Sequence, residues 1–262
     1  MEATALWRIS IALGLLLLLL VAERRWPRRQ ESSQWRLRWT ANLGLSLGST
    51  VLVRGLLGAG AMGAAVLAQS KEWGVFAVLL LPEALEVLLS LVLLDLLIYG
   101  QHRLFHTLPL LWRLHRVHHS DLQVDATTAL RFHPVEILLS MGLKMAAVIA
   151  LGAPPLAVLA FEVLLNACAM FNHANLTLSP RLDRALRGLL ITPDLHRVHH
   201  SVHGDEMRSN YGFSVPWWDH LFGSYRAQPR DGHTSMRLGV EQFRTQDEQR
   251  ALALLAQPLR PV

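Results

Sequence analysis

The chain has 262 residues, of which 52% are hydrophobic and only 17% are charged, a composition more apolar than is usual for a soluble domain. Its single cysteine excludes a disulfide framework and a cysteine-based zinc site. The net charge of +5 comes from basic residues that flank apolar stretches, and this placement favours anionic lipid rather than nucleic acid as the partner.

The first expected element is a membrane helix over residues 4–22. This stretch has Arg8 as its only charge and is long enough to cross a bilayer. A cleaved signal peptide is the alternative. No small-residue cleavage site follows, however, and the basic residues come after the apolar run rather than before it. A retained membrane anchor is therefore expected.

Four further apolar stretches follow, at residues 40–68, 75–99, 134–151 and 154–171. The last two are separated only by "GAPP", which is typical of a tight helical hairpin. Their lengths and compositions make these stretches candidates for membrane helices. The expected fold is therefore all-α, an integral membrane, multi-pass bundle of four or five helices.

Arginine is concentrated between the first two apolar stretches. The segment 23–39 contains Arg24, Arg25, Arg28, Arg29, Arg36 and Arg38. Positive loops favour the cytoplasmic side, so this segment is expected in the cytoplasm and the N-terminus outside. Counting spans onward places the chain near residue 100, and everything from residue 172, in the cytoplasm as well.

Histidines are clustered in three short motifs. "HRLFH" begins at residue 102, and "LHRVHHS" occurs twice, at 114–120 and 195–201. Thr192 and Pro193 are typical of a helix start, which indicates that the last motif is helical. Residues three and four apart share a helix face, so each motif is expected to direct its imidazoles at one point. The motifs contain His102, His106, His115, His118, His119, His196, His199 and His200.

So many histidines at the expected cytoplasmic ends of the membrane helices predict a metal site in a helical cap. Neutral imidazole is the commonest metal ligand, and without metal these buried nitrogens would lack partners. A structural zinc takes four ligands, so eight histidines suit two ions. His173 and His133 are further candidates. Nitrogen ligands alone do not choose among iron, zinc and copper.

The order of the motifs is similar to that of a known superfamily. The residues concerned are Asp95 and Tyr99, followed by "HRLFH", "WRLHRVHHS", "LRFHPVE", "NHANL", "TPDLHRVHHS", "NYG" and "WDHLFG". Across residues 80–226 the chain resembles the fatty acid hydroxylase / sterol desaturase superfamily of integral membrane di-iron enzymes.

The resemblance implies that two iron ions use O₂ and external electrons to hydroxylate or desaturate a lipid, such as a fatty acyl chain, a sterol or a related isoprenoid. It implies as ligands the eight histidines above together with His173. His133, or a water held by Asn172 or Asn175, would complete the set. No redox domain is fused, so a separate ferredoxin- or cytochrome-type donor is expected.

Asp95 lies seven residues before His102, on the same helical face. We therefore expect it to accept a hydrogen bond from a ligating imidazole and to fix its orientation. Glu136 and Asp194 are weaker candidates for this role. The expected organisation is an N-terminal membrane region (1–74), a catalytic region (75–226) and a polar C-terminal tail (227–262).

Two other classes of protein fit the sequence less well. A zinc-dependent membrane hydrolase would want an acid–base carboxylate beside an open zinc, as in HExxH, and that motif is absent from the sequence. A metal transporter would place its ligands near the middle of the membrane, whereas these motifs lie at the ends of the expected spans. Hydroxylation and desaturation share one oxidant, and the sequence leaves both open.

Overall fold

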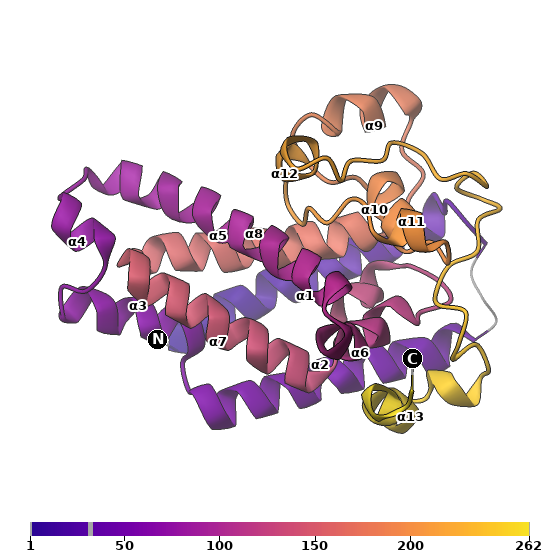
Figure 1. Cartoon of the computed structure of the whole chain (residues 1–262), viewed down its shortest axis with the longest axis horizontal. Helices are drawn as coiled ribbons and strands as arrows, with labels where there is room; N and C mark the ends of the chain where they lie inside the picture. The colour runs from indigo at the N-terminus through magenta and orange to yellow at the C-terminus, as the bar shows by residue number, and fades with distance from the viewer. Residues whose placement is uncertain (1, 31–33, 262) are drawn as a thin grey trace.

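A computed structural model describes residues 2–30 and 34–261, and the elements that it contains in this part of the chain are helices (Figure 1). The expected all-α fold is therefore confirmed. Five helices are long: α1 (Glu2–Arg25), α2 (Trp35–Leu57), α5 (Glu83–Thr107), α7 (Pro134–Leu151) and α8 (Pro155–His173). They run alongside one another and form an elongated bundle (Figure 1).

The shorter elements gather mainly at the two ends of this bundle. Helices α3 (Gly60–Ser70) and α4 (Val75–Leu79) lie at one end (Figure 1). At the other end lies a set of elements that we call the cap, and the C-terminal segment packs there too (Figure 1). The elements of the cap are α6 (Pro109–His119), η1 (Ala126–Leu130), α9 (Pro180–Leu186), α10 (Pro193–His199), α11 (Gly204–Met207), α12 (Trp217–Leu221), η2 (Asp247–Gln249), α13 (Ala251–Ala256) and η3 (Gln257–Leu259).

Three described segments are long and apolar enough to cross a membrane: Trp35–Leu79, Pro134–Leu151 and Pro155–His173. Helices α1 and α5 have 24 and 25 residues, or roughly 36–38 Å at about 1.5 Å per residue, so they match the thickness of a bilayer in length. For part of the expected span 4–22, the side chains lie outside the described part of the structure. The total of four or five membrane helices stays a prediction.

Two of the expected spans are broken where the backbone leaves the helical region. Gly58 has φ +58°, and it ends α2 inside the stretch 40–68. Leu80 is left-handed and Pro82 follows it, so the stretch 75–99 is divided into α4 and α5. The expectation of two continuous helices was therefore wrong. The sequence did not reveal the breaks because the residues on both sides of each are apolar.

The expected tight hairpin between α7 and α8 is present. Gly152 ends α7 with φ +69°, and a Cβ atom there would lie 2.4 Å from the carbonyl oxygen of Trp73. Glycine is therefore required by both the backbone conformation and the close approach. Farther along the same pair of helices, Lys144 Nζ lies 3.0 Å from Glu162 Oε1, and both side chains are buried.

Candidate metal centre

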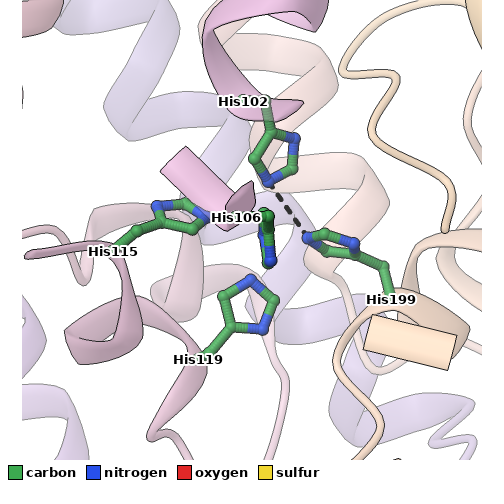
Figure 2. Close-up of side chains that lie close together, drawn as sticks. All are labelled: His102, His106, His115, His119 and His199. Carbon is green, nitrogen blue, oxygen red and sulfur yellow. Dashed lines mark hydrogen bonds between the residues drawn. The ribbon is translucent and has the colours of Figure 1, made fainter. Parts of the chain in front are cut away.

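Nine buried histidines form two groups in the cap and at the adjoining helix ends. The five-histidine group contains His102, His106, His115, His119 and His199. The four-histidine group contains His118, His173, His196 and His200. Within each group, one ring nitrogen from every member lies within 4.8 Å of the others. Figure 2 shows the five rings of the first group arranged around a common centre.

The positions of these histidines follow from where the helices end. His102 and His106 are one turn apart in the last turns of α5, which ends before Pro109 starts α6. His173 is the last residue of α8. Thr192 caps α10 by accepting a hydrogen bond from the Leu195 N–H at 3.3 Å, as its sequence predicts. Four separate helix ends therefore converge on one place.

The two copies of "LHRVHHS" each contribute to both groups. In the first copy, His115 and His119 belong to the five-histidine group, and His118 belongs to the four-histidine group. In the second copy the division is reversed: His196 and His200 join the four-histidine group, and His199 joins the other. The expectation that each motif aims at one point is confirmed for His102 and His106, which share the five-histidine group. It is wrong for the two heptapeptides, because positions i+3 and i+4 of a helix diverge enough to face adjacent centres.

The two groups are in direct contact. The rings of His119 and His200, one from each group, stack with their centroids 4.5 Å apart. His173 Nε2 lies 3.1 Å from His118 Nε2 and 3.1 Å from His196 Nε2. The nine histidines therefore form one continuous cluster with two centres.

Four of the rings are held from outside through their Nδ1 atoms. His102 donates to the carbonyl oxygen of Tyr211 at 2.8 Å, and His199 donates to that of Ser209 at 2.7 Å. His173 donates to the Ala169 carbonyl oxygen at 2.6 Å. A neutral imidazole with its proton on Nδ1 presents a lone pair on Nε2, and in these rings Nε2 faces the centre of a group.

The fourth ring is held by the carboxylate of Glu136 rather than by that of Asp95, which the sequence favoured. His115 Nδ1 lies 2.6 Å from Glu136 Oε1, at the start of α7. Asp95 makes no hydrogen bond to an imidazole of the described residues; its Oδ2 accepts a hydrogen bond from Trp218 Nε1 at 2.8 Å. Glu136 was the weaker sequence signal, because it lies 21 residues from His115 along the chain.

Several ring nitrogens of the cluster have no hydrogen-bond partner, although they are buried. Both nitrogens of His106, His119 and His200 are in this state. Leaving such groups unpaired costs free energy, so this observation fits metal ligation. Burial also lowers the pKa of His115 to about 3 and that of His119 well below its ordinary value. The rings are therefore neutral near pH 7, the state in which imidazole binds iron, zinc or copper.

The structure places His133 outside both groups. Its Nδ1 accepts a hydrogen bond from the Val135 N–H at 3.2 Å and so caps α7, while Nε2 donates to the Leu255 carbonyl oxygen at 3.2 Å. Asn175 uses its amide to bond the backbone of Arg29. The imidazole of His133 and the amide of Asn175 are therefore engaged in hydrogen bonds outside the two histidine groups.

The arginines of the repeated heptapeptide point away from the histidines. Arg116 is 2% exposed, and its guanidinium donates to the carbonyl oxygens of Gln257, Arg260 and Pro261 at 2.5, 2.6 and 3.2 Å. Arg197 donates to Asp194 instead. The repeat therefore directs its histidines toward the metal centre and its arginine toward the outer wall of the cap.

The C-terminal segment forms part of that wall. Gln249 Nε2 donates to the Ser120 carbonyl oxygen at 3.2 Å, and its Oε1 accepts from Arg131 at 2.9 Å. Leu254 is fully buried against Val117 of the first heptapeptide. Sequence reasoning missed these contacts because the segment reads as polar.

The fatty acid hydroxylase family matches residues 87–224, which are 138 of the 262 residues and include both histidine groups. An ornithine lipid hydroxylase from Rhizobium tropici is 32% identical over 155 residues, covering 59% of this chain and 46% of the relative. Alkylglycerol monooxygenase from Homo sapiens is 32% identical over 133 residues, covering 50% and 28%. A very-long-chain aldehyde decarbonylase from Oryza sativa subsp. indica is 28% identical over 143 residues, covering 50% and 22%.

The chain thus spans less than half the length of each of these relatives. No solved structure matches it significantly. The family match covers more than half of the chain and every histidine of the two groups. The chain therefore belongs to the fatty acid hydroxylase family.

Proposed function

We propose that this chain is a membrane-bound lipid oxygenase that holds two iron ions and uses O₂ to hydroxylate or desaturate a lipid. One observation carries the proposal: nine buried histidines form two adjoining groups, and both ring nitrogens of His106, His119 and His200 lack a hydrogen-bond partner. The family match and the names of the relatives support it, since these include a lipid hydroxylase and an alkylglycerol monooxygenase.

The residues present fit two metal ions. The five-histidine group would hold one ion and the four-histidine group the other. When bound, redox-active metal ions supply the O₂ activation that an unactivated C–H bond requires and that side chains lack. Zinc would fill the same nitrogen ligands without supplying redox chemistry.

The protein's own part is to hold the rings and to exclude water. Glu136 and the carbonyl oxygens of Tyr211, Ser209 and Ala169 fix four rings through Nδ1. No member of the nine is more than 8% exposed, so bulk water does not compete for the ring nitrogens. Such burial also protects a reactive oxidant from side reactions.

The position of the histidines at the end of the bundle suits a lipid substrate. Exposed leucines surround the turn between α5 and α6: Leu104 is 49% exposed, Leu108 47% and Leu110 75%. An exposed apolar patch of this kind fits contact with lipid. The alkyl chain would approach along the bundle, and the arginines of segment 23–39 support a cytoplasmic location for the cap.

Both reactions consume electrons from outside. Hydroxylation takes one O₂, two electrons and two protons, and yields the alcohol and one water. Desaturation takes the same reagents, removes two hydrogens from the lipid and yields two waters. The chain would therefore act with a separate one-electron donor, such as a ferredoxin- or cytochrome-type protein.

The test begins with the metal content of the full chain purified from iron-supplemented cells. About two irons per chain, and incorporation of ¹⁸O from ¹⁸O₂ into a lipid of the expressing cells, are expected for a hydroxylase. A desaturase would consume O₂ and form an unsaturated lipid without the label. The His106→Ala variant should lose the product, and His133→Ala, outside both groups, should retain it. Protein that folds without metal and leaves the lipids unchanged would refute the proposal.

A further inference from the structure

Trp112 connects the five-histidine group to the surface of the cap. It lies on α6, and its ring centroid is 5.2 Å from that of His106 and 5.5 Å from that of His119. The tryptophan is only partly buried, whereas the histidines that it contacts are buried. On its other side it packs against a cluster in the cap formed by Met207, Val240 and Phe243.

The other partly buried aromatic rings that contact the histidines face different surroundings. Phe213, whose ring lies 5.6 Å from that of His102, packs against the core of the membrane bundle. Phe132 stacks on His118 with centroids 4.3 Å apart and lies two residues before the start of α7 at Pro134. Trp112 is thus the ring that extends from the five-histidine group into the cap.

Three arginines, on α5, on α6 and directly after α11, carry no ion pair in the part of the chain that the structure describes: Arg103, Arg113 and Arg208. Arg113 follows Trp112, and Arg208 follows Met207 of the cluster. Arg103 lies on α5 between His102 and His106. The ring of Tyr211, three residues after Arg208, lies 5.3 Å from that of His106.

Two cavities beside α1 do not reach the histidines. The cavity of about 180 Å³ beside the ends of α1 and α2 is not lined by any of the nine, nor is the smaller one between α1 and α8. An electron can enter without a channel, because it needs only a short contact between rings, and Trp112 provides one.

We propose that Trp112 and the three arginines form the docking surface for an acidic, one-electron carrier protein, and that the electron passes through the indole to the five-histidine group. The inference rests on the proposed function, which requires two electrons for each lipid oxidised. Each encounter oxidises the carrier by one electron, so two encounters serve one turnover. The unpaired arginines select a negatively charged partner because complementary charge steers association.

The first experiment measures docking. The full chain in phosphatidylcholine nanodiscs is titrated with an acidic plant-type [2Fe–2S] ferredoxin at several salt concentrations. The variant Arg103→Glu/Arg113→Glu/Arg208→Glu should bind at least tenfold more weakly at low salt. The matched control Arg181→Glu/Arg184→Glu changes exposed arginines of α9, on another side of the cap, and should bind like the unmodified chain (Figure 1).

The second experiment measures electron transfer. Reduced ferredoxin is mixed anaerobically with the iron-loaded chain, and its reoxidation is followed by absorbance. At saturating ferredoxin, Trp112→Leu should slow this step at least tenfold while its iron content stays unchanged. Trp112→Phe, which retains an aromatic ring, should recover most of the rate. Reduced methyl viologen serves as the small donor that needs no docking surface.

Three outcomes would overturn the inference. The α9 control might weaken binding as much as the triple variant does, or Trp112→Leu might transfer electrons at the unmodified rate. The triple variant might also keep its affinity for ferredoxin but lose binding to phosphatidylglycerol vesicles, which would assign the arginines to a lipid surface. Failure of the proposed function has a different signature: the unmodified chain with iron and methyl viologen would consume no O₂, whereas the ferredoxin titration would still report on the surface.

Discussion

His102 and His199 face each other with their Nε2 atoms 3.0 Å apart, although 97 residues separate them in the sequence. Each ring donates its Nδ1 proton to a backbone carbonyl oxygen, of Tyr211 and of Ser209. A neutral imidazole has only one ring proton, so two lone pairs meet at this distance. A cation between them removes the repulsion, and this pair is therefore the sharpest local indication of a metal ion.

Replacing a member of either group should abolish lipid oxidation. We expect His199→Ala and His118→Ala to lower activity at least a hundredfold, because one removes a lone pair from the five-histidine group and the other from the four-histidine group. Both variants should still insert into the membrane. Product formation and iron content are measured together, and full activity in either variant would remove its histidine from the ligand set.

Glu136 should strengthen metal binding without being essential for it. Losing a carboxylate that orients a ligating histidine typically weakens metal binding by about 10- to 100-fold. We expect Glu136→Ala to show such a loss, and Glu136→Gln a smaller one, because the amide oxygen can still accept from His115. Chelator titration of the metal-loaded protein measures the effect. The comparison variant is Asp95→Asn, which should retain metal because Asp95 accepts a hydrogen bond from Trp218 and makes none to an imidazole of the described residues.

The metal-free protein should lose stability on acidification. His115 has a folded-state pKa of about 3, against an ordinary value of 6.5 that applies when the chain unfolds. Unfolding therefore takes up a proton between these values, and stability falls as the pH is lowered from about 6.5 toward 3. Thermal unfolding of chelated protein in detergent should show a lower Tm at pH 5 than at pH 7.5. A Tm that does not change with pH over this range would contradict the inference that the histidine rings are buried and neutral in the folded protein.

The ion pair between α7 and α8 should show strong coupling. Removing one partner leaves the other charge buried, which typically costs about 3–5 kcal/mol. We therefore expect Lys144→Met or Glu162→Leu alone to lower stability markedly, and the double variant to recover most of the loss. Denaturation of all four proteins in detergent gives the coupling. Independent, additive effects would show that the pair contributes little.

The contacts between Arg116 and the C-terminal segment should stabilise the position of the first heptapeptide. Arg116→Met removes a buried guanidinium and leaves three carbonyl oxygens without their donor. Buried groups that lose a partner typically cost about 1–3 kcal/mol each. We expect a lower Tm and reduced metal content, whereas Arg181→Met on the exposed face of α9 should change neither.

The sequence identified the histidines of the cluster, but it did not show which of the two groups each histidine belongs to. Spacing of three and four residues indicated helical motifs directed inward, and all eight motif histidines are in the two groups together with His173. Assignment to one centre or the other depends on the angle between α6 and α10, which no local pattern encodes. His118 and His119 are neighbours in sequence, yet they belong to different groups.

The charge pattern of the sequence did not reveal the contacts that its arginines make. Arg38 was counted among the basic residues flanking a membrane helix. In the structure it is 2% exposed and binds Asp121 and Asp125 at 2.6 and 2.8 Å. A surface arginine and a buried one look alike in a sequence, because the partners here are more than 80 residues away.

The crossed contribution of the two heptapeptides has a consequence for the order of assembly. Each centre draws ligands from both copies, so neither can form on a partly synthesised chain that lacks the second copy. Helix α8 must also be in place, because His173 ends it. On the proposed function, the metal ions would link the two heptapeptides only after the second copy has been synthesised, and loss of either copy would remove ligands from both groups.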